Sequence, residues 1–145
     1  MSADLVIASY VRIAKQDLDG ARLLNAAANR NAAYPCEQAA EKLMRAVLTS
    51  EGIQAGNRHD LPDMVAKVPD ANPVKPLLRA LEHPDAYATA FRYPSPSGRI
   101  KVPPTGPELD HDIDRIEAAL LEVATRFAVD LAHADGPAGT PGPIR

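Results

Sequence analysis

The sequence has little of what a disulfide-stabilised or membrane-spanning protein needs. Its 145 residues include one cysteine, no tryptophan, four tyrosines and two phenylalanines. A single cysteine excludes an intramolecular disulfide and suits a reducing compartment, and Cys36 lies among alanines as a small core residue would. No apolar run approaches the ~18 residues that a membrane span requires. The first residues, MSADLVIASYVRIAKQD, lack the basic start of a secretory signal, so we expect a cytoplasmic location without membrane attachment.

Charge is nearly balanced, and this excludes a global attraction to nucleic acid. The formal net charge is −3, so a surface for an anionic ligand has to come from local clustering. One such cluster is residues 92–101, RYPSPSGRIK, which contain Arg92, Arg99 and Lys101 and no acidic residue. It begins a proline-rich stretch, residues 92–106, without helical or strand periodicity. Loops of this length inside compact domains are often functional.

Apolar residues recur at three- and four-residue intervals, and no segment alternates with a period of two. This pattern predicts long helices over residues 3–29, 31–52 and from 105 through Phe127, with short helices near 61–67 and 77–81 and a further turn within 85–91. Asn31 is the expected N-cap of the second helix, whose outer face would carry its polar and charged side chains (Glu37, Gln38, Glu41, Lys42 and Arg45).

These elements predict an all-α, up-and-down helical bundle of three long and two or three short helices. The chain is long enough to bury a core without a metal or a disulfide, and it has the length of one domain. We place that domain at residues 1–134. The remaining residues, 135–145, read DGPAGTPGPIR, and we expect this Pro/Gly-rich tail to be disordered.

Three motifs in order resemble the HEPN domain (higher eukaryotes and prokaryotes nucleotide-binding). They are the Gln-Ala-Ala-Glu-Lys helix beginning at Gln38, the His-Asp-Leu beginning at His59, and the Arg-Tyr-Pro beginning at Arg92. The resemblance extends over about residues 5–129. It implies a helical bundle that is usually a homodimer and is often encoded beside a minimal nucleotidyltransferase, sometimes as half of a toxin–antitoxin pair.

The same resemblance implies two alternatives for activity. Many HEPN proteins are RNases in which an arginine is followed, after four to six residues, by a histidine, whereas others are non-catalytic binding modules. Arg58 and His59 are adjacent, and Arg79 and His83 are one residue too close. Arg126 and His133 fit the spacing, and on a helix they would lie roughly 10 Å apart along its axis. Because this pair stands alone before the tail, we favour a non-catalytic module and keep a metal-independent RNase as the alternative.

Five residues are candidate ligand contacts, each with a structural alternative. Arg92 can bind a phosphate and Tyr93 can stack on a base, or the two can anchor the loop. Lys42 and Arg45 can face a nucleotide or a partner subunit, or form a solvated face with neighbouring glutamates. His59 can contact a phosphate or base, or bond a neighbouring helix while Asp60 caps the next one.

Metal and cofactor sites are not predicted. Asp110, His111 and Asp112 offer one histidine among aspartates, which we assign to the favourable interaction of acids with a helix N-terminus. The sequence has no Gly-rich phosphate loop, no paired-cysteine site and no serine nucleophile motif. We therefore predict no cofactor.

Overall fold

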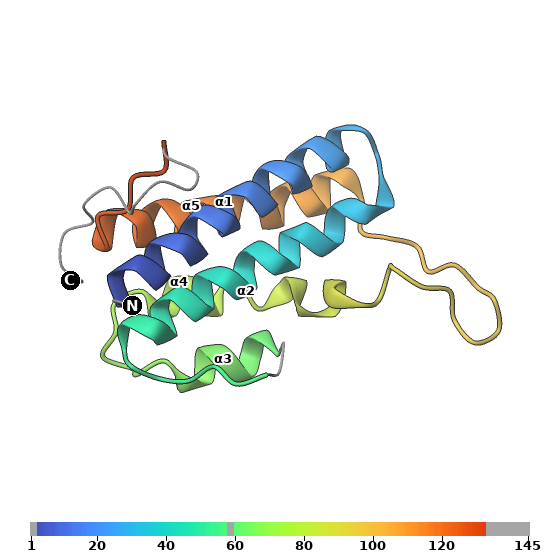
Figure 1. The fold of residues 1–145 in the computed structure, drawn as a ribbon. Coiled ribbons are helices and arrows are strands. Elements are labelled where there is room, and N and C mark those ends of the chain that lie inside the picture. The colour runs from blue at the N-terminus through green and yellow to red at the C-terminus, as the bar shows by residue number, and fades with distance from the viewer. Residues whose placement is uncertain (1–2, 58–59, 133–145) are drawn as a thin grey trace.

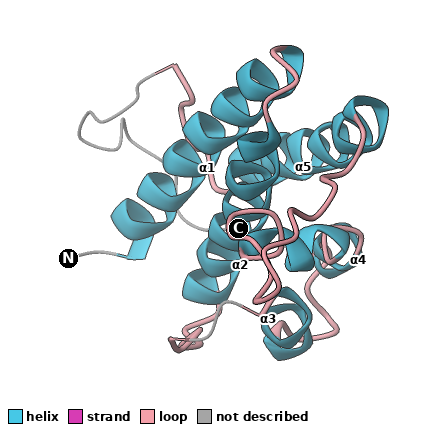
Figure 2. Ribbon diagram, turned by 90° about the vertical axis from the view of Figure 1, so that its right-hand side faces the viewer, coloured by secondary structure: helices cyan, strands magenta, loops and turns pink. Residues whose placement is uncertain are grey.

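The computed structural model describes residues 3–57 and 60–132. Three long helices lie side by side: α1 (Ala3–Ala26), α2 (Ala33–Ser50) and α5 (Gly106–Arg126) (Figure 1). Two short helices, α3 (Leu61–Lys67) and α4 (Lys75–Arg79), and two 3-10 turns, η1 (Arg30–Ala32) and η2 (His83–Ala88), connect them. The described residues contain no strand, and the prediction of an all-α bundle is confirmed (Figure 2).

The long helices alternate in direction around α1. Asn25 near the end of α1 donates to Gly106 and Asp110 at the start of α5, while Arg12 in the first half of α1 donates to the carbonyl of Asp130, beyond the end of α5. Helix α2 runs antiparallel to α1 as well. Helices α2 and α5 therefore run in the same direction, and the short elements between them carry the chain back along the bundle (Figure 1).

The apolar stripes predict the core well. The stripe of α5 is buried throughout: Leu109, Ile113, Ile116, Leu120, Val123 and Phe127. Helix α2 adds a face of small residues that lets α1 pack closely against it: Cys36, Ala39, Ala40, Ala46 and Val47. The resulting bundle forms a single hydrophobic core.

Helix ends follow local capping chemistry, with one exception. Asp60 accepts a hydrogen bond from the amide of Asp63 at 3.0 Å, and Thr105 accepts one from Glu108 at 3.2 Å, as the caps predict. Gly52 has φ +72°, the left-handed geometry expected after α2. The predicted cap at Asn31 is wrong. The side chain of Asn29 caps η1 instead, and α2 begins only after that turn.

The predicted outer face of α2 is also wrong in part. Glu37 and Glu41 are 0% and 4% exposed, so these carboxylates lie inside the bundle and not in solvent. Helix α2 contacts α1, η2, α5 and α3, so more of its surface is covered than its own periodicity indicates. The pair of Glu41 with Arg45, predicted from their i,i+4 spacing, is confirmed at 2.8 Å.

Candidate functional site: a stacked arginine at one end of the bundle

Arg92 lies against the ring of Tyr34, at the start of α2, and against that of Tyr93, the next residue in the loop. Its guanidinium carbon is 4.1 Å from the ring centroid of Tyr34 and 5.3 Å from that of Tyr93. Such stacking covers the faces of a guanidinium and leaves its N–H edge for other partners. Among the described residues no carboxylate pairs with Arg92, whose one hydrogen bond is a long 3.5 Å contact to the carbonyl of Ala88. The Tyr93 ring is 62% exposed.

Arg30 fixes the loop that follows Arg92. Its Nε donates to the carbonyl of Phe91 at 3.2 Å, and its Nη2 donates to the carbonyl of Lys101 at 2.7 Å. The two ends of the loop are therefore held by one side chain. At the tip a turn closes where the amide of Ser95 donates to the carbonyl of Arg99 at 2.8 Å, and the loop projects from the end of the bundle (Figure 1).

A buried carboxylate positions the turn that leads into Arg92. Asp112 of α5 is 3% exposed. The hydroxyl of Tyr87 donates to it at 2.7 Å, and Nδ1 of His83 lies 3.0 Å away. Burial, followed by the hydrogen bond to Asp112, raises the pKa of Tyr87 above its ordinary range, so the phenol stays protonated. The assignment of Asp112 to a helix-terminus role is wrong, because Asp112 ties η2 to α5.

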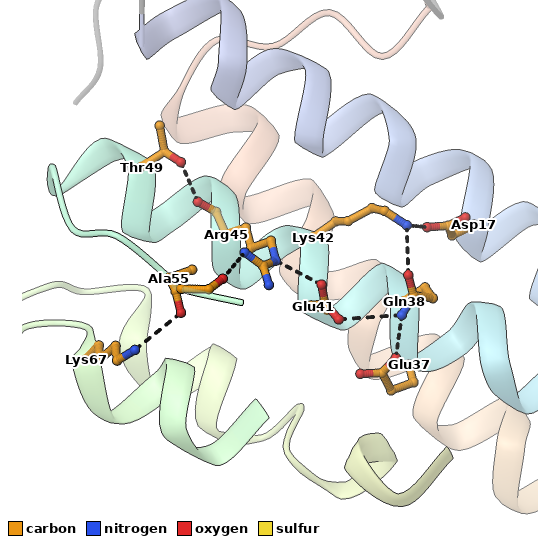
Figure 3. A network of polar contacts seen from close by, with 10 residues as sticks. Asp17, Glu37, Gln38, Glu41, Lys42, Arg45, Thr49, Ala55 and Lys67 are labelled. Carbon is orange, nitrogen blue, oxygen red and sulfur yellow. Dashed lines mark hydrogen bonds and ion pairs between the residues drawn. The ribbon is translucent and has the colours of Figure 1, made fainter. Parts of the chain in front are cut away.

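Lys42 and Arg45 lie in a separate network on α2 (Figure 3). Lys42 bonds Asp17 of α1, and its Nζ is 3.4 Å from the side-chain oxygen of Gln38. Arg45 bonds Glu41 and donates to the carbonyl of Gly56 at 3.2 Å. The two side chains are 21% and 16% exposed. Arg45 is eleven residues from Tyr34, roughly 16 Å along α2, so the predicted contacts form two groups and not one site.

The other predicted site residues are His59, His133 and Arg126. His59 and His133 lie outside the described residues, as does the predicted tail at 135–145. Arg126, the proposed RNase partner of His133, forms an ion pair with Glu122 one turn earlier on α5, with 3.3 Å between Nε and Oε1.

Nothing in the described part of the chain offers an evident metal or thiol chemistry. Residues 3–57 and 60–132 contain no group of three or more metal-ligating side chains. Cys36 is buried, and burial together with nearby Asp112 and Glu37 raises the pKa of its thiol, which keeps it unreactive. Within the same residues, no helix has the length and apolar character of a membrane span.

Comparison with known families agrees with this architecture. The family model of the HEPN domain matches residues 7–124. The chain belongs to the HEPN family. No curated protein and no solved structure gives a match to it. HEPN domains are generally related to nucleotides and RNA, and they commonly dimerise.

Sequence reasoning missed two residues of the Arg92 site in this HEPN domain. Tyr34 lies 58 residues before Arg92, and Arg30 lies in the turn that interrupts the first helical pattern. One signal was present, since Tyr34 lies four residues before the motif at Gln38 that contributes to the family resemblance. Nothing in its position along the chain indicates that its ring meets Arg92.

Proposed function

We propose that this HEPN domain is a non-catalytic module that binds RNA or a nucleotide at the end of the bundle, with Arg92 and Tyr93 as its main contacts. The stacked Arg92 carries the proposal. Its N–H groups face no carboxylate among the described residues, so they can form charge-assisted bonds to a phosphate. The exposed ring of Tyr93 can stack on a base, and Arg99 and Lys101 add positive charge along the loop.

The test is the affinity of a fluorescein-labelled single-stranded RNA for the wild type and for Arg92→Ala. We expect affinity to fall about 10-fold. The slope of log K against log salt concentration should become shallower by about one, because one phosphate contact is lost. The melting temperature should change little, because Arg92 is exposed. Arg79→Ala is the matched control, since the Arg79 side chain is 58% exposed and its ion pair within residues 3–57 and 60–132 is with Glu82. Unchanged affinity with a lowered melting temperature would identify Arg92 as a purely structural residue.

The outer face of α1 supports a homodimer as part of this function. Leu5 and Ile13 are 38% and 44% exposed, and Val6, Ser9 and Tyr10 form a shallow apolar surface beside Ile13. A charge in this surface would be desolvated in a dimer. Ile13→Glu should therefore convert the dimer to a monomer in light scattering after size exclusion, with the helical signal preserved. A wild-type monomer at all concentrations would contradict the dimer.

A minimal nucleotidyltransferase is the protein partner that we propose, as in a toxin–antitoxin pair, and the cytoplasm is the proposed location. Co-expression of the two chains followed by size exclusion tests the complex.

The alternative function is a metal-independent RNase that uses Arg126 and His133. Incubating the purified protein with RNA in EDTA distinguishes the two functions. Cleavage that is lost on His133→Ala would favour the RNase, and intact RNA would favour the binding module.

A further inference from the structure

A small cavity opens beside the Arg92 site. It has a volume of about 170 Å³ and lies between the end of α1, η1, the last residues of the loop and the first turn of α5. Its walls are mainly apolar: Ala33, Pro103, Pro104 and Leu109. At ~30 Å³ per water in the liquid, this volume corresponds to five or six waters. It suits one small planar ring system and is too small for a drug-sized ligand.

Two side-chain amides at the cavity have free hydrogen-bonding groups. Nδ2 of Asn25 donates to the carbonyl of Gly106 at 3.1 Å and to Asp110 at 2.7 Å, which leaves its Oδ1 as an acceptor. Oδ1 of Asn29 accepts from the amide of Asn31 at 2.8 Å, which leaves its Nδ2 as a donor. Within the described part of the chain neither free group has a partner. The edge of a nucleobase carries both donors and acceptors, so one free acceptor and one free donor in the cavity lining suit it.

The charge around the cavity favours a neutral ring there and a phosphate nearby. The carboxylate of Asp110 accepts a hydrogen bond from Asn25, which lines the cavity, so its negative charge disfavours an anion there. Arg30 lines the cavity and also donates to the carbonyl of Phe91, the residue before Arg92. Arg30 therefore contacts both the cavity and the backbone next to Arg92. Tyr34, on which Arg92 stacks, follows the cavity residue Ala33 in the chain.

We propose that this cavity holds the base of a nucleotide whose phosphate is bound by Arg92, an inference that rests on the proposed function. The apolar walls and the two prolines cover the faces of the ring, and Asn25 and Asn29 bond its edge. The ligand class is a mononucleotide or one nucleotide of an RNA chain. Both sources present the same base and phosphate.

Gly106→Leu tests the cavity directly. Gly106 lines it at the first turn of α5, and a Cβ there would meet only Oδ1 of Asn25, at 4.0 Å. The backbone of Gly106 is not left-handed and the space beside it is open, so a leucine there would extend into the space that the base would occupy. Pro107 disfavours a helical residue with a Cβ before it, so we expect the substitution to lower stability to some extent. Ala118→Leu is the matched control, because it also introduces a leucine into α5, on the exposed side of the helix. Gly106→Ile is a second filling variant, and melting temperatures check that all three fold.

Calorimetry with AMP, adenosine and ribose 5-phosphate separates the base from the phosphate. We expect Gly106→Leu to weaken AMP and adenosine at least ~10-fold and to leave ribose 5-phosphate unchanged, since only the first two carry a base. Arg92→Ala should weaken AMP and ribose 5-phosphate and leave adenosine unchanged.

The labelled RNA used above distinguishes the two sources. If Gly106→Leu weakens RNA but AMP does not bind, the cavity serves a nucleotide within RNA. If it weakens AMP as well, the cavity takes a free nucleotide. If both affinities stay within about twofold of wild type in both filling variants while Arg92→Ala lowers them, the base pocket is refuted and the proposed function stands. If Arg92→Ala changes neither, the proposed function itself fails.

Discussion

The cations at the middle of α2 and the cation beside its beginning have different kinds of partner. In the middle, Lys42 and Arg45 are bound to the carboxylates of Asp17 and Glu41 and lie largely covered. At the beginning, Arg92 rests on the ring of Tyr34 and has no such carboxylate among the described residues. Carboxylates use up the donors of a cation, whereas an aromatic ring covers its face and leaves the N–H edge available. The two regions therefore differ in whether the donors of their cations remain available for a ligand.

Arg45→Ala should have the largest effect on stability. It leaves Glu41, whose side chain is 5% exposed, buried without this cation, and we expect a loss of about 2–4 kcal/mol in the free energy of unfolding. Urea denaturation measures the loss, and RNA affinity should stay near wild type. Lys15→Ala is the control, since its pair with Asp19 is exposed and should contribute under ~1 kcal/mol. If the two variants lost equal amounts of unfolding free energy, the covered ion pair would not contribute more to stability than the exposed one.

Tyr87→Phe tests how firmly the turn below Arg92 is held. The variant keeps the ring and deletes only the hydroxyl that donates to buried Asp112 at 2.7 Å. We expect about 1–3 kcal/mol lower stability in urea, because the carboxylate loses one of its donors. RNA affinity should fall much less than it does in Arg92→Ala. A large loss of binding would mean that the position of η2 matters more than the guanidinium.

Alkaline pH should weaken the fold through two buried groups. Burial raises the pKa of the Cys36 thiol above its ordinary 9.0 and that of the Tyr87 phenol above 10.0. Because the unfolded chain releases these protons first, stability is complete below pH ~9 and declines as pH rises above it. Urea denaturation across this range should show the decline. Cys36→Ala and Tyr87→Phe should each reduce the loss of unfolding free energy with rising pH. If neither variant changes that loss, groups other than these two cause it.

Tyr34→Leu should have the smallest effect on stability and still weaken binding. It removes the ring under Arg92, a contact worth about 0.5–1 kcal/mol at an exposed site. We expect RNA affinity to fall several-fold, because the guanidinium is no longer held in place. Tyr34→Phe keeps the stacking surface and should behave like wild type. If Tyr34→Leu also leaves affinity unchanged, stacking does not prepare Arg92 for a ligand.

Features set by neighbouring residues could be predicted, and those set by distant ones could not. Helix α3 begins and ends where its sequence indicates, because Asp60 caps it through an amide three residues away. The burial of Glu37 could not be predicted, since other elements cover it. The separation of Lys42 from Arg92 depends on Asp17 and Tyr34, which are 25 and 58 residues from their partners along the chain. The family resemblance identified the loop as a site of interest without showing what supports it.

The two bonds from Arg30 to the ends of the loop also bear on how this protein can change through evolution. Because Phe91 and Lys101 are held by one side chain, the residues between them can vary without moving their anchors. Lengthening a flexible loop costs little chain entropy, about 0.6 kcal/mol for each doubling. Insertions and exchanges between residues 92 and 100 should therefore be tolerated by the fold. A lineage could alter what this end of the bundle recognises while the helical core stays the same.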